Sequence, residues 1–226
     1  MQTVPTQMFK LGHVKIRPSY FFSMTFEKRQ HMKLGDLLEI RSGLVLSRKQ
    51  SKERTPYLYS ILTLRAIQDD GFIDSEKIET AYMVESLGAE YVTHPGDLVV
   101  RLTFPYTAVL ISEDTKNIVV PSNFLILRTK HNLLLPEYLY WFLNTETVRQ
   151  TLYEQATSNM LGAIKKQTFV ALEVTLPSLL EQEKFGHIYF LAQRENQLLQ
   201  ELAAQKKKYY SMALNKIYDG LRRVQK

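Results

Sequence analysis

Apolar residues recur in the C-terminal part of the chain at steps of mostly three, four or seven positions, the spacing of one face of an α-helix. This stripe comprises Phe185, Ile188, Leu191, Leu198, Leu202, Tyr209, Ala213, Ile217 and Leu221. No proline follows Pro177, and Ser178 with Glu181 three positions later has the sequence of an N-terminal capping box. The pattern predicts one helix over residues 178–226, on the order of 60 Å long, too long for one small domain to cover. We therefore expect a second helix to pack against it, and the expected interface positions are Ile188, Leu191, Leu198, Leu202, Tyr209, Ala213 and Ile217.

The region before residue 178 has no single hydrophobic period. Alternating polar and apolar residues, or short apolar runs beside turn signals, predict strands at 57–64, 98–102, 107–112, 124–129 and 173–176. Short helices are predicted over 35–42, from Pro136 onward, and over 165–172. Because strands and helices do not alternate regularly, we expect an α+β domain over residues 1–177, with mixed strands and short helices. The long helix for coiled-coil packing then occupies residues 178–226.

The composition allows one packed domain and excludes several classes of protein. A chain of 226 residues with 45% hydrophobic residues can bury one full core. Because it contains no cysteine, it forms neither disulfides nor cysteine zinc sites. No apolar run approaches the roughly 18 residues of a membrane span, and residues 1–10 lack the apolar core of a signal peptide. We therefore expect a cytoplasmic protein with no membrane partner.

The net charge of +6 is unevenly distributed. Lysine and arginine dominate residues 10–33, 41–54 and 206–226, whereas aspartate and glutamate dominate residues 69–97. The basic segments would attract a polyanion, and the acidic segment would repel it. A solvated surface with ordinary clustering explains the same distribution, so charge alone leaves both interpretations open.

The sequence lacks the residue groups that carry the common chemistries. A methyltransferase acting on a DNA amino group needs a polar-Pro-Pro-aromatic loop, and residues 104–106 lack the polar residue and the second proline. We interpret them as a turn between strands. There is no glycine-rich nucleotide loop, and the five histidines include no helical pair that could hold a metal. The sequence therefore predicts a non-catalytic protein with no cofactor and no metal site.

Several predicted loops carry side chains that read base edges in duplex DNA, namely long donors for guanine and amides for adenine. The candidate DNA-binding residues are Arg41, Arg48, Lys49, Lys52, Arg101, Thr103, Tyr106, Ser122, Asn123, Ser158, Asn159, Lys165 and Lys166. The stretch 47–52 contains no hydrophobic residue, and Arg101 lies at the end of a predicted strand. Taken singly, each candidate is also compatible with ordinary surface, and Asn123 with a role in the turn after Pro121.

Three parts of the chain occur in an informative order and spacing. They are residues 33–43 (KLGDLLEIRSG); residues 95–100 (PGDLVV) with 120–128 (VPSNFLILR); and residues 136–143 (PEYLYWFL) with 176–182 (LPSLLEQ) and the long helix. From about Leu34 to the C-terminus, the chain resembles the specificity (DNA-recognition) subunits of type I restriction-modification systems. It departs from them in having room for one recognition domain and one long helix, where family members usually carry two of each. It also has residues 156–159 where the family often has a Gly-Ser pair.

The resemblance implies a subunit that reads specific bases in double-stranded DNA and positions a separate methyltransferase subunit, with a restriction subunit as a further candidate partner. Catalysis would then belong to those partners. In the family the two long helices pack together, so a chain with one helix is expected to form an antiparallel homodimer. A two-fold dimer would read a two-part site as an inverted repeat.

A second interpretation stays open. The chain could be a non-catalytic protein-interaction adaptor whose domain binds another protein and whose helix dimerises. Salt separates the two interpretations, because DNA binding that neutralises Z phosphates weakens with log salt at a slope of about −0.9Z. An apolar protein interface would hardly respond.

Overall fold

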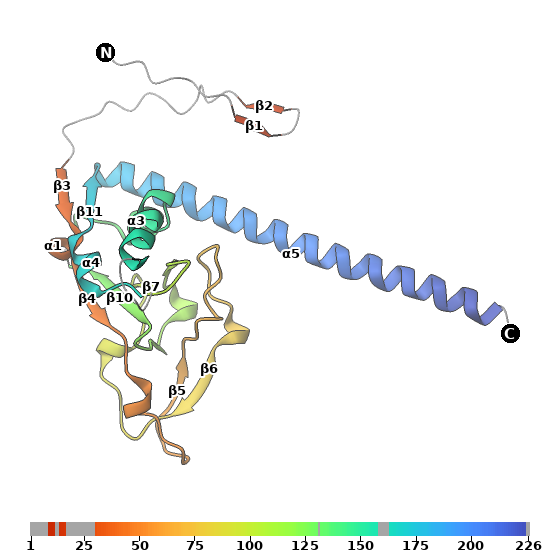
Figure 1. Ribbon diagram of the computed structural model, residues 1–226, viewed down its shortest axis with the longest axis horizontal. Helices are drawn as coiled ribbons and strands as arrows, with labels where there is room; N and C mark the ends of the chain where they lie inside the picture. Colours follow the sequence, from red (N-terminus) through yellow and green to blue (C-terminus); the bar gives the residue numbers. More distant parts are fainter. Residues whose placement is uncertain (1–8, 12–13, 17–29, 131, 158–162, 225–226) are drawn as a thin grey trace.

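The computed structural model describes residues 9–11, 14–16, 30–130, 132–157 and 163–224, with side chains in the ranges 30–130, 132–157 and 163–220. Its strands are β1 (Phe9–Leu11), β2 (Val14–Ile16), β3 (Gln30–Lys33), β4 (Leu38–Ser42), β5 (Leu58–Ile61), β6 (Glu79–Tyr82), β7 (Leu98–Arg101), β8 (Ala108–Leu110), β9 (Ile118–Val119), β10 (Phe124–Thr129) and β11 (Glu173–Leu176). Its α-helices are α1 (Leu34–Leu37), α2 (Pro136–Leu143), α3 (Glu146–Thr157), α4 (Lys166–Ala171) and α5 (Leu179–Val224). Short 3-10 turns are η1 (Leu46–Arg48), η2 (Ser75–Lys77), η3 (Ala89–Tyr91) and η4 (Glu113–Thr115). Figure 1 shows a mixed domain from which α5 projects, so the predicted α+β class with a long C-terminal helix is confirmed.

An antiparallel sheet with the strand order β4-β10-β7-β8 forms the centre of the domain. Successive residues of a strand point to opposite faces, and here both faces are buried. Leu98 and Leu127 belong to a core cluster that includes side chains from α1, α2, α3 and α4. Val99 and Ile126 belong to a second cluster, which includes side chains from residues 62–78. Two-sided burial explains why the central strands are continuous apolar runs in the sequence.

The predicted helix over 35–42 is wrong beyond its first turn. Helix α1 ends at Leu37, and the next residues form β4, which pairs with β10. Leu38 and Ile40 are buried, and the residues that follow each of them are half-exposed, as in a strand. Pairing with β10 and burial of alternate side chains override the local preference for a helix.

A smaller sheet with the order β6-β5-β9 lies beyond the central sheet, on the side away from β3 and β11 (Figure 1). Strand β5 pairs antiparallel with β6 and parallel with β9. A separate core cluster of Leu44, Ile61, Met83 and Val119 supports this sheet. The strand predicted at 57–64 is confirmed as the shorter β5.

The helix predicted from Pro136 is confirmed, but it ends at Leu143 and a second helix, α3, follows. Asn144 lies at the junction and is buried. Its side-chain amide accepts a hydrogen bond from Ala108 N at 3.1 Å and donates one to Ala108 O at 3.0 Å. These two bonds satisfy backbone groups of β8, at the edge of the central sheet, and tie the helices to that edge.

Helix α5 begins where the sequence predicts. The capping box is confirmed, because Ser178 N donates to Glu181 Oε2 at 2.9 Å and Glu181 N donates to Ser178 Oγ at 3.4 Å. One turn later, the buried side chain of Gln182 donates to Leu133 O and accepts from Leu135 N, each at 2.9 Å. Gln182 therefore fixes the start of α5 to the segment that leads into α2.

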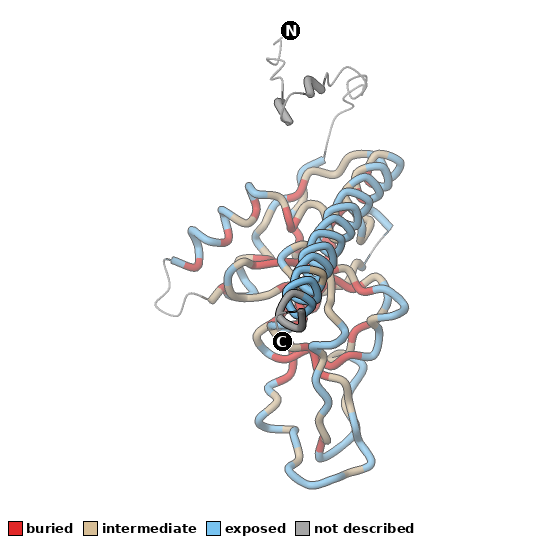
Figure 2. The backbone as a smooth tube through the Cα atoms, turned by 90° about the vertical axis from the view of Figure 1, so that its right-hand side faces the viewer, coloured by how far each residue is buried: buried red, intermediate tan, exposed pale blue. Residues whose placement is uncertain are grey.

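The first turns of α5 pack closely on the domain. A Cβ atom at Gly186 would lie 2.4 Å from Glu137 Cβ, so glycine permits the close crossing of α5 and α2. Phe190 contacts Phe72, with ring centroids 6.1 Å apart. Beyond this contact, α5 is almost entirely exposed, as the pale-blue helix in Figure 2 shows. The whole helix has 46 residues, equivalent to about 70 Å. Within the described residues, each helix is either too short or too polar to cross a lipid bilayer.

Candidate nucleic-acid interface

Strand pairing brings several predicted DNA-binding residues to one end of the central sheet. Phe124 of β10 lies opposite Arg101 of β7, and Leu125 lies opposite Ser42 of β4. Strands β4 and β7 therefore end where β10 begins. The loops after β4, after β7 and before β10 meet there, which places Arg101 beside the loop that carries Asn123.

Backbone hydrogen bonds join these loops. Leu102 N donates to Asn123 O at 3.1 Å, and Ile164 N donates to Leu102 O at 2.9 Å. The second bond brings in the start of α4, where Lys165 and Lys166 are exposed. We call this meeting point of residues 41–45, 101–107, 120–123 and 163–166 the loop end.

The loops after β4 and before β10 pass each other at very short range. Gly43 N donates to Phe124 O at 3.1 Å, and Leu44 N donates to Val120 O at 2.7 Å. A Cβ atom at Gly43 would lie 2.0 Å from Pro121 O, far inside van der Waals contact. Only glycine fits this crossing without moving one of the two loops.

Gly43→Ala is expected to destabilise the domain by about 2 kcal/mol, because the added methyl group overlaps the backbone of the opposing loop. The free energy of unfolding in urea measures this effect. Gly220→Ala on α5 is the matched control, since nothing lies within 4 Å of its added Cβ. The control should be neutral or slightly stabilising, as alanine is the better helix former. Equal effects of the two substitutions would contradict the close crossing at Gly43.

The loop between β7 and β8 is braced by its own residues. Arg101 Nη2 donates to Phe104 O at 3.2 Å, and Tyr106 N donates to Thr103 O at 3.0 Å. Tyr106 is 3% exposed, and burial raises the pKa of its phenol. Its side chain therefore packs in the core beneath the loop and does not face solvent. The exposed ring of this loop belongs to Phe104, at 70%, an apolar residue outside the predicted set of polar DNA contacts.

The basic segment after β4 lies beside the smaller sheet. Val84 N donates to Lys49 O at 2.9 Å, and the Lys49 ammonium forms an ion pair with Glu85. These residues thus lie between the loop end and the smaller sheet, with Arg48 and Lys52 exposed and Lys49 paired with a carboxylate.

The remaining candidates differ in their surroundings. Arg41 forms an ion pair with Glu39, and this hydrogen bond lowers the pKa of the Glu39 carboxyl. Ser122 is exposed, whereas Thr103 and Asn123 are half-buried. The predicted contacts Ser158 and Asn159 lie outside the described residues.

Unpaired polar atoms gather at the loop end. Arg101 Nε, Asn123 Oδ1 and Thr107 Oγ1 are buried and have no hydrogen-bond partner within the described part of the chain. Buried polar atoms without a partner are uncommon in folded proteins, so each needs a physical reason. Two of them belong to residues that the sequence singled out as readers of base edges.

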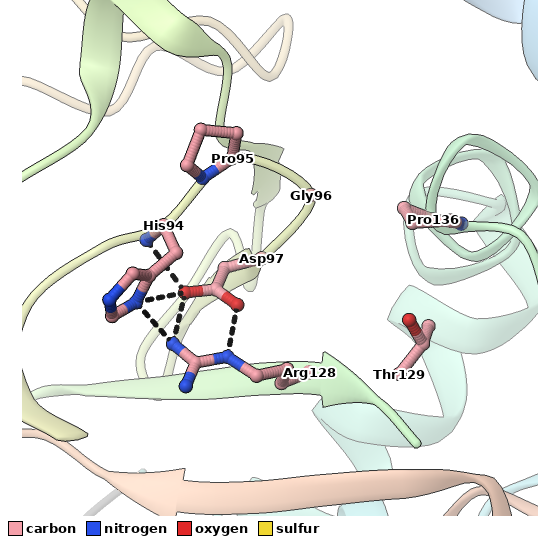
Figure 3. Close-up of a pocket in the computed structure, with 7 residues that line it drawn as sticks. All are labelled: His94, Pro95, Gly96, Asp97, Arg128, Thr129 and Pro136. Atoms are coloured by element: carbon pink, nitrogen blue, oxygen red, sulfur yellow. Dashed lines mark hydrogen bonds and ion pairs between the residues drawn. The ribbon is translucent and has the colours of Figure 1, made fainter. Parts of the chain in front are cut away.

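A pocket at the opposite end of the central sheet surrounds a buried ion pair (Figure 3). Asp97 is 2% exposed and accepts hydrogen bonds from Arg128 Nε and Nη2, both at 2.7 Å, and from His94 N at 2.8 Å. His94 Nδ1 lies 2.6 Å from Arg128 Nη2 and accepts from it, because a guanidinium only donates. The charged groups of this pocket satisfy one another, and they fix the turn that precedes β7.

Asp97→Asn is expected to lower the free energy of unfolding by about 2 kcal/mol, since it leaves Arg128 without its anionic partner. Arg128 retains some access to water, which keeps the loss below that of a fully buried pair. Glu79→Gln is the control, because the Glu79–Arg65 pair is exposed and should contribute little. Urea unfolding compares the two variants, and a larger loss in the control would contradict the role given to Asp97.

Comparison with solved structures identifies the architecture. A chain of a type I R-M system, solved in a study of complex assembly and conformational transition, aligns with a TM-score of 0.57 and 17% identity over 80% of this chain and 46% of that one. The HsdS subunit from Thermoanaerobacter tengcongensis aligns with a TM-score of 0.53 and 18% identity over 75% of this chain and 43% of that one. The chain has the fold of a type I specificity subunit.

The resemblance inferred from the sequence is thus confirmed at the level of the fold. The chain spans less than half the length of both solved chains, at 46% and 43%. No family model and no curated protein matches the sequence. The three short segments that carry the resemblance therefore indicate the fold, although the sequence as a whole matches neither a family model nor a curated protein.

Proposed function

We propose that the chain is the non-catalytic DNA-recognition subunit of a type I restriction-modification complex and that its loop end reads double-stranded DNA. The observation that carries this proposal is the meeting of four chain segments rich in hydrogen-bond donors at one end of the central sheet. The shared fold with an HsdS subunit supports the same function.

The chemistry of the loop end suits both base edges and phosphates. Arg101 and Lys165 can donate hydrogen bonds to guanine or to phosphate oxygens. Asn123 has a side-chain amide, the group that forms paired hydrogen bonds with adenine. Backbone hydrogen bonds hold the loops together, so little order has to be gained on binding. The unpaired side-chain atoms of Arg101 and Asn123 are consistent with groups that gain partners when these side chains rotate toward DNA on the fixed backbone.

The proposed DNA contacts are Arg48, Lys52, Arg101, Thr103, Ser122, Asn123, Lys165 and Lys166, and the undescribed Ser158 and Asn159 remain candidates. Arg41 and Lys49 contribute only if phosphates replace their present partners Glu39 and Glu85. Tyr106 is assigned a supporting role, because its side chain is buried beneath the loop.

Helix α5 is proposed to pair with the same helix of a second copy. Its stripe exposes large apolar side chains, including Ile188 at 49%, Leu191 at 51%, Leu198 at 49%, Leu202 at 48%, Tyr209 at 67% and Ile217 at 61%, with Ala213 half-buried between them. A second copy supplies an identical stripe, and antiparallel pairing gives the self-complementary contact of a two-fold dimer. The helix pair would separate the two loop ends and act as a rigid spacer. A methyltransferase subunit, with or without a restriction subunit, would supply the chemistry in the cytoplasm.

Selection of duplexes from a random pool tests this proposal. A two-fold dimer with two identical reading surfaces should enrich an inverted repeat that is interrupted by a fixed number of unread base pairs. Binding to the enriched duplex should weaken steeply with salt, at a slope of about −0.9 per phosphate contact. An asymmetric motif, or no enrichment even with a methyltransferase subunit present, would contradict the proposal.

The same titration addresses the adaptor interpretation. If the domain binds a protein through apolar contacts, DNA binding at physiological salt will be weak and without sequence preference. A motif of defined sequence with a steep salt slope would exclude that interpretation.

A further inference from the structure

Phe104 has the most exposed ring among the described large hydrophobic side chains, at 70%. It lies at the tip of the loop between β7 and β8, within the loop end. A single exposed hydrophobic residue is ordinary on a protein surface and needs no explanation by itself. What distinguishes Phe104 is how the loop holds it and which residues surround it.

The loop presents this ring outward on a fixed backbone. The Phe104 carbonyl accepts a hydrogen bond from Arg101 Nη2 at 3.2 Å, and the Phe104 ring packs nearly perpendicular to the buried Tyr106 ring, at a centroid distance of 6.1 Å. Tyr106 has a φ of 59°, in the left-handed region that bulky residues rarely adopt. Strained backbone of this kind costs free energy, is held by the surrounding structure, and clusters at active and ligand-binding sites.

The readout groups proposed so far at the loop end are polar. Arg101 ends β7 directly before this loop, and Asn123 is joined to the loop through the hydrogen bond from Leu102 N to Asn123 O. Such groups read guanine and adenine, whereas thymine presents a 5-methyl group, the apolar feature of the major groove. An outward apolar ring among these donors matches that methyl group.

We propose that Phe104 contacts the 5-methyl group of a thymine in the target site and thereby sets sequence preference at one position of each half-site. This inference rests on the proposed DNA-recognition function and adds a specificity-determining residue to it. The contact is apolar and non-ionic, so it contributes to preference without adding to the salt slope.

The experiment uses the full chain and the duplex that it enriches from a random pool. Each thymine of that duplex is replaced singly with deoxyuridine, which removes the methyl group and keeps every hydrogen-bonding atom. The wild-type protein should lose about fourfold in affinity at one thymine per half-site, the value of one buried methyl group. Phe104→Ala should bind the thymine and uracil duplexes equally, and Phe104→Leu should retain part of the difference.

Leu133→Ala is the matched control. Leu133 is 52% exposed but follows β10 at the other end of the central sheet, so this variant should discriminate uracil as the wild type does. Thermal unfolding should change little in any variant, because at least half of each replaced residue is exposed to solvent.

The outcomes separate this inference from the proposed function. An enriched motif with no uracil-sensitive position, or discrimination that survives in Phe104→Ala, overturns the inference and leaves DNA recognition standing. A 2-aminopurine base placed next to the contacted thymine reports unstacking of the base pairs by a rise in fluorescence. If wild-type protein causes this rise and Phe104→Ala does not, the ring inserts between base pairs, which also overturns the inference. If no motif is enriched, both the proposed DNA-recognition function and the Phe104 inference are contradicted.

Discussion

Replacing Leu198 and Leu202 with glutamate is expected to convert the proposed α5 dimer into monomers. Both leucines lie on the exposed stripe of α5, at 49% and 48% exposure in the single chain. Burying a leucine is worth about 1.5–3 kcal/mol, and a two-fold dimer buries four such side chains at these positions. The double substitution should raise the dissociation constant by about a thousandfold or more, since it also places four carboxylates in the seam. Sedimentation equilibrium at tens of micromolar measures this change.

The matched control adds the same charges on another face of the helix. Gln200 and Ser211 lie about half a turn away from the centre of the stripe at 100° per residue, and both are exposed. Gln200→Glu with Ser211→Glu should leave the dimer intact. Because Leu198 is exposed and lies about two turns beyond the contact of Phe190 with Phe72, the monomeric variant should keep the melting temperature of its globular part. A wild-type protein that is monomeric at these concentrations would rule out the α5 dimer.

Local signals were sufficient for the elements whose start and end residues the sequence itself encodes. Strand β10 was predicted with its observed bounds, 124–129, because an apolar run follows the turn at Pro121. Helix α2 begins at its first-turn proline, Pro136, and α5 begins behind the capping box of Ser178. In each case the residue that starts the element lies within a few positions of it.

The misplaced or missed features depend on residues that are distant in sequence. The segment 35–42 forms mostly strand because β10 lies beside it, and the break after α2 depends on the hydrogen bonds of Asn144 to β8. Neither partner can be read from the local pattern. The same reason applies to Gly43, whose requirement for glycine comes from the backbone of Pro121.

The sequence predicts which loop residues belong to the candidate site, but not which of them lie together on one surface. Donor-rich loops were recognised singly, and the strand register then brought Arg101 and Asn123 together. The residue type of Tyr106 predicts a DNA contact, yet the left-handed backbone at this position accompanies a buried Tyr106 side chain and an exposed Phe104 ring. Which of two aromatic neighbours faces solvent depends on the loop geometry, and the sequence does not report that geometry.

Replacing Arg48 and Arg101 together with alanine is expected to lower affinity for the enriched duplex by about a hundredfold. Losing one base contact of a guanidinium costs roughly 1–3 kcal/mol, and the two residues lie on different elements, η1 and β7, so their effects should add. Arg101 also braces the Phe104 carbonyl, and its loss should therefore relax sequence preference as well as affinity. Competition between the enriched duplex and a scrambled one measures both quantities.

The lysine triplet at 206–208 provides the contrasting variant. These side chains lie on the exposed part of α5, far along the helix from its contact with the domain. Alanine at all three positions removes three positive charges but should leave the ratio of affinities for enriched and scrambled duplexes unchanged. If some of these lysines touch phosphates, binding to all sequences weakens alike and the salt slope falls by about one per lost contact. Loss of preference in the triplet variant, with preference kept in the arginine variant, would place the reading surface on α5 and not at the loop end.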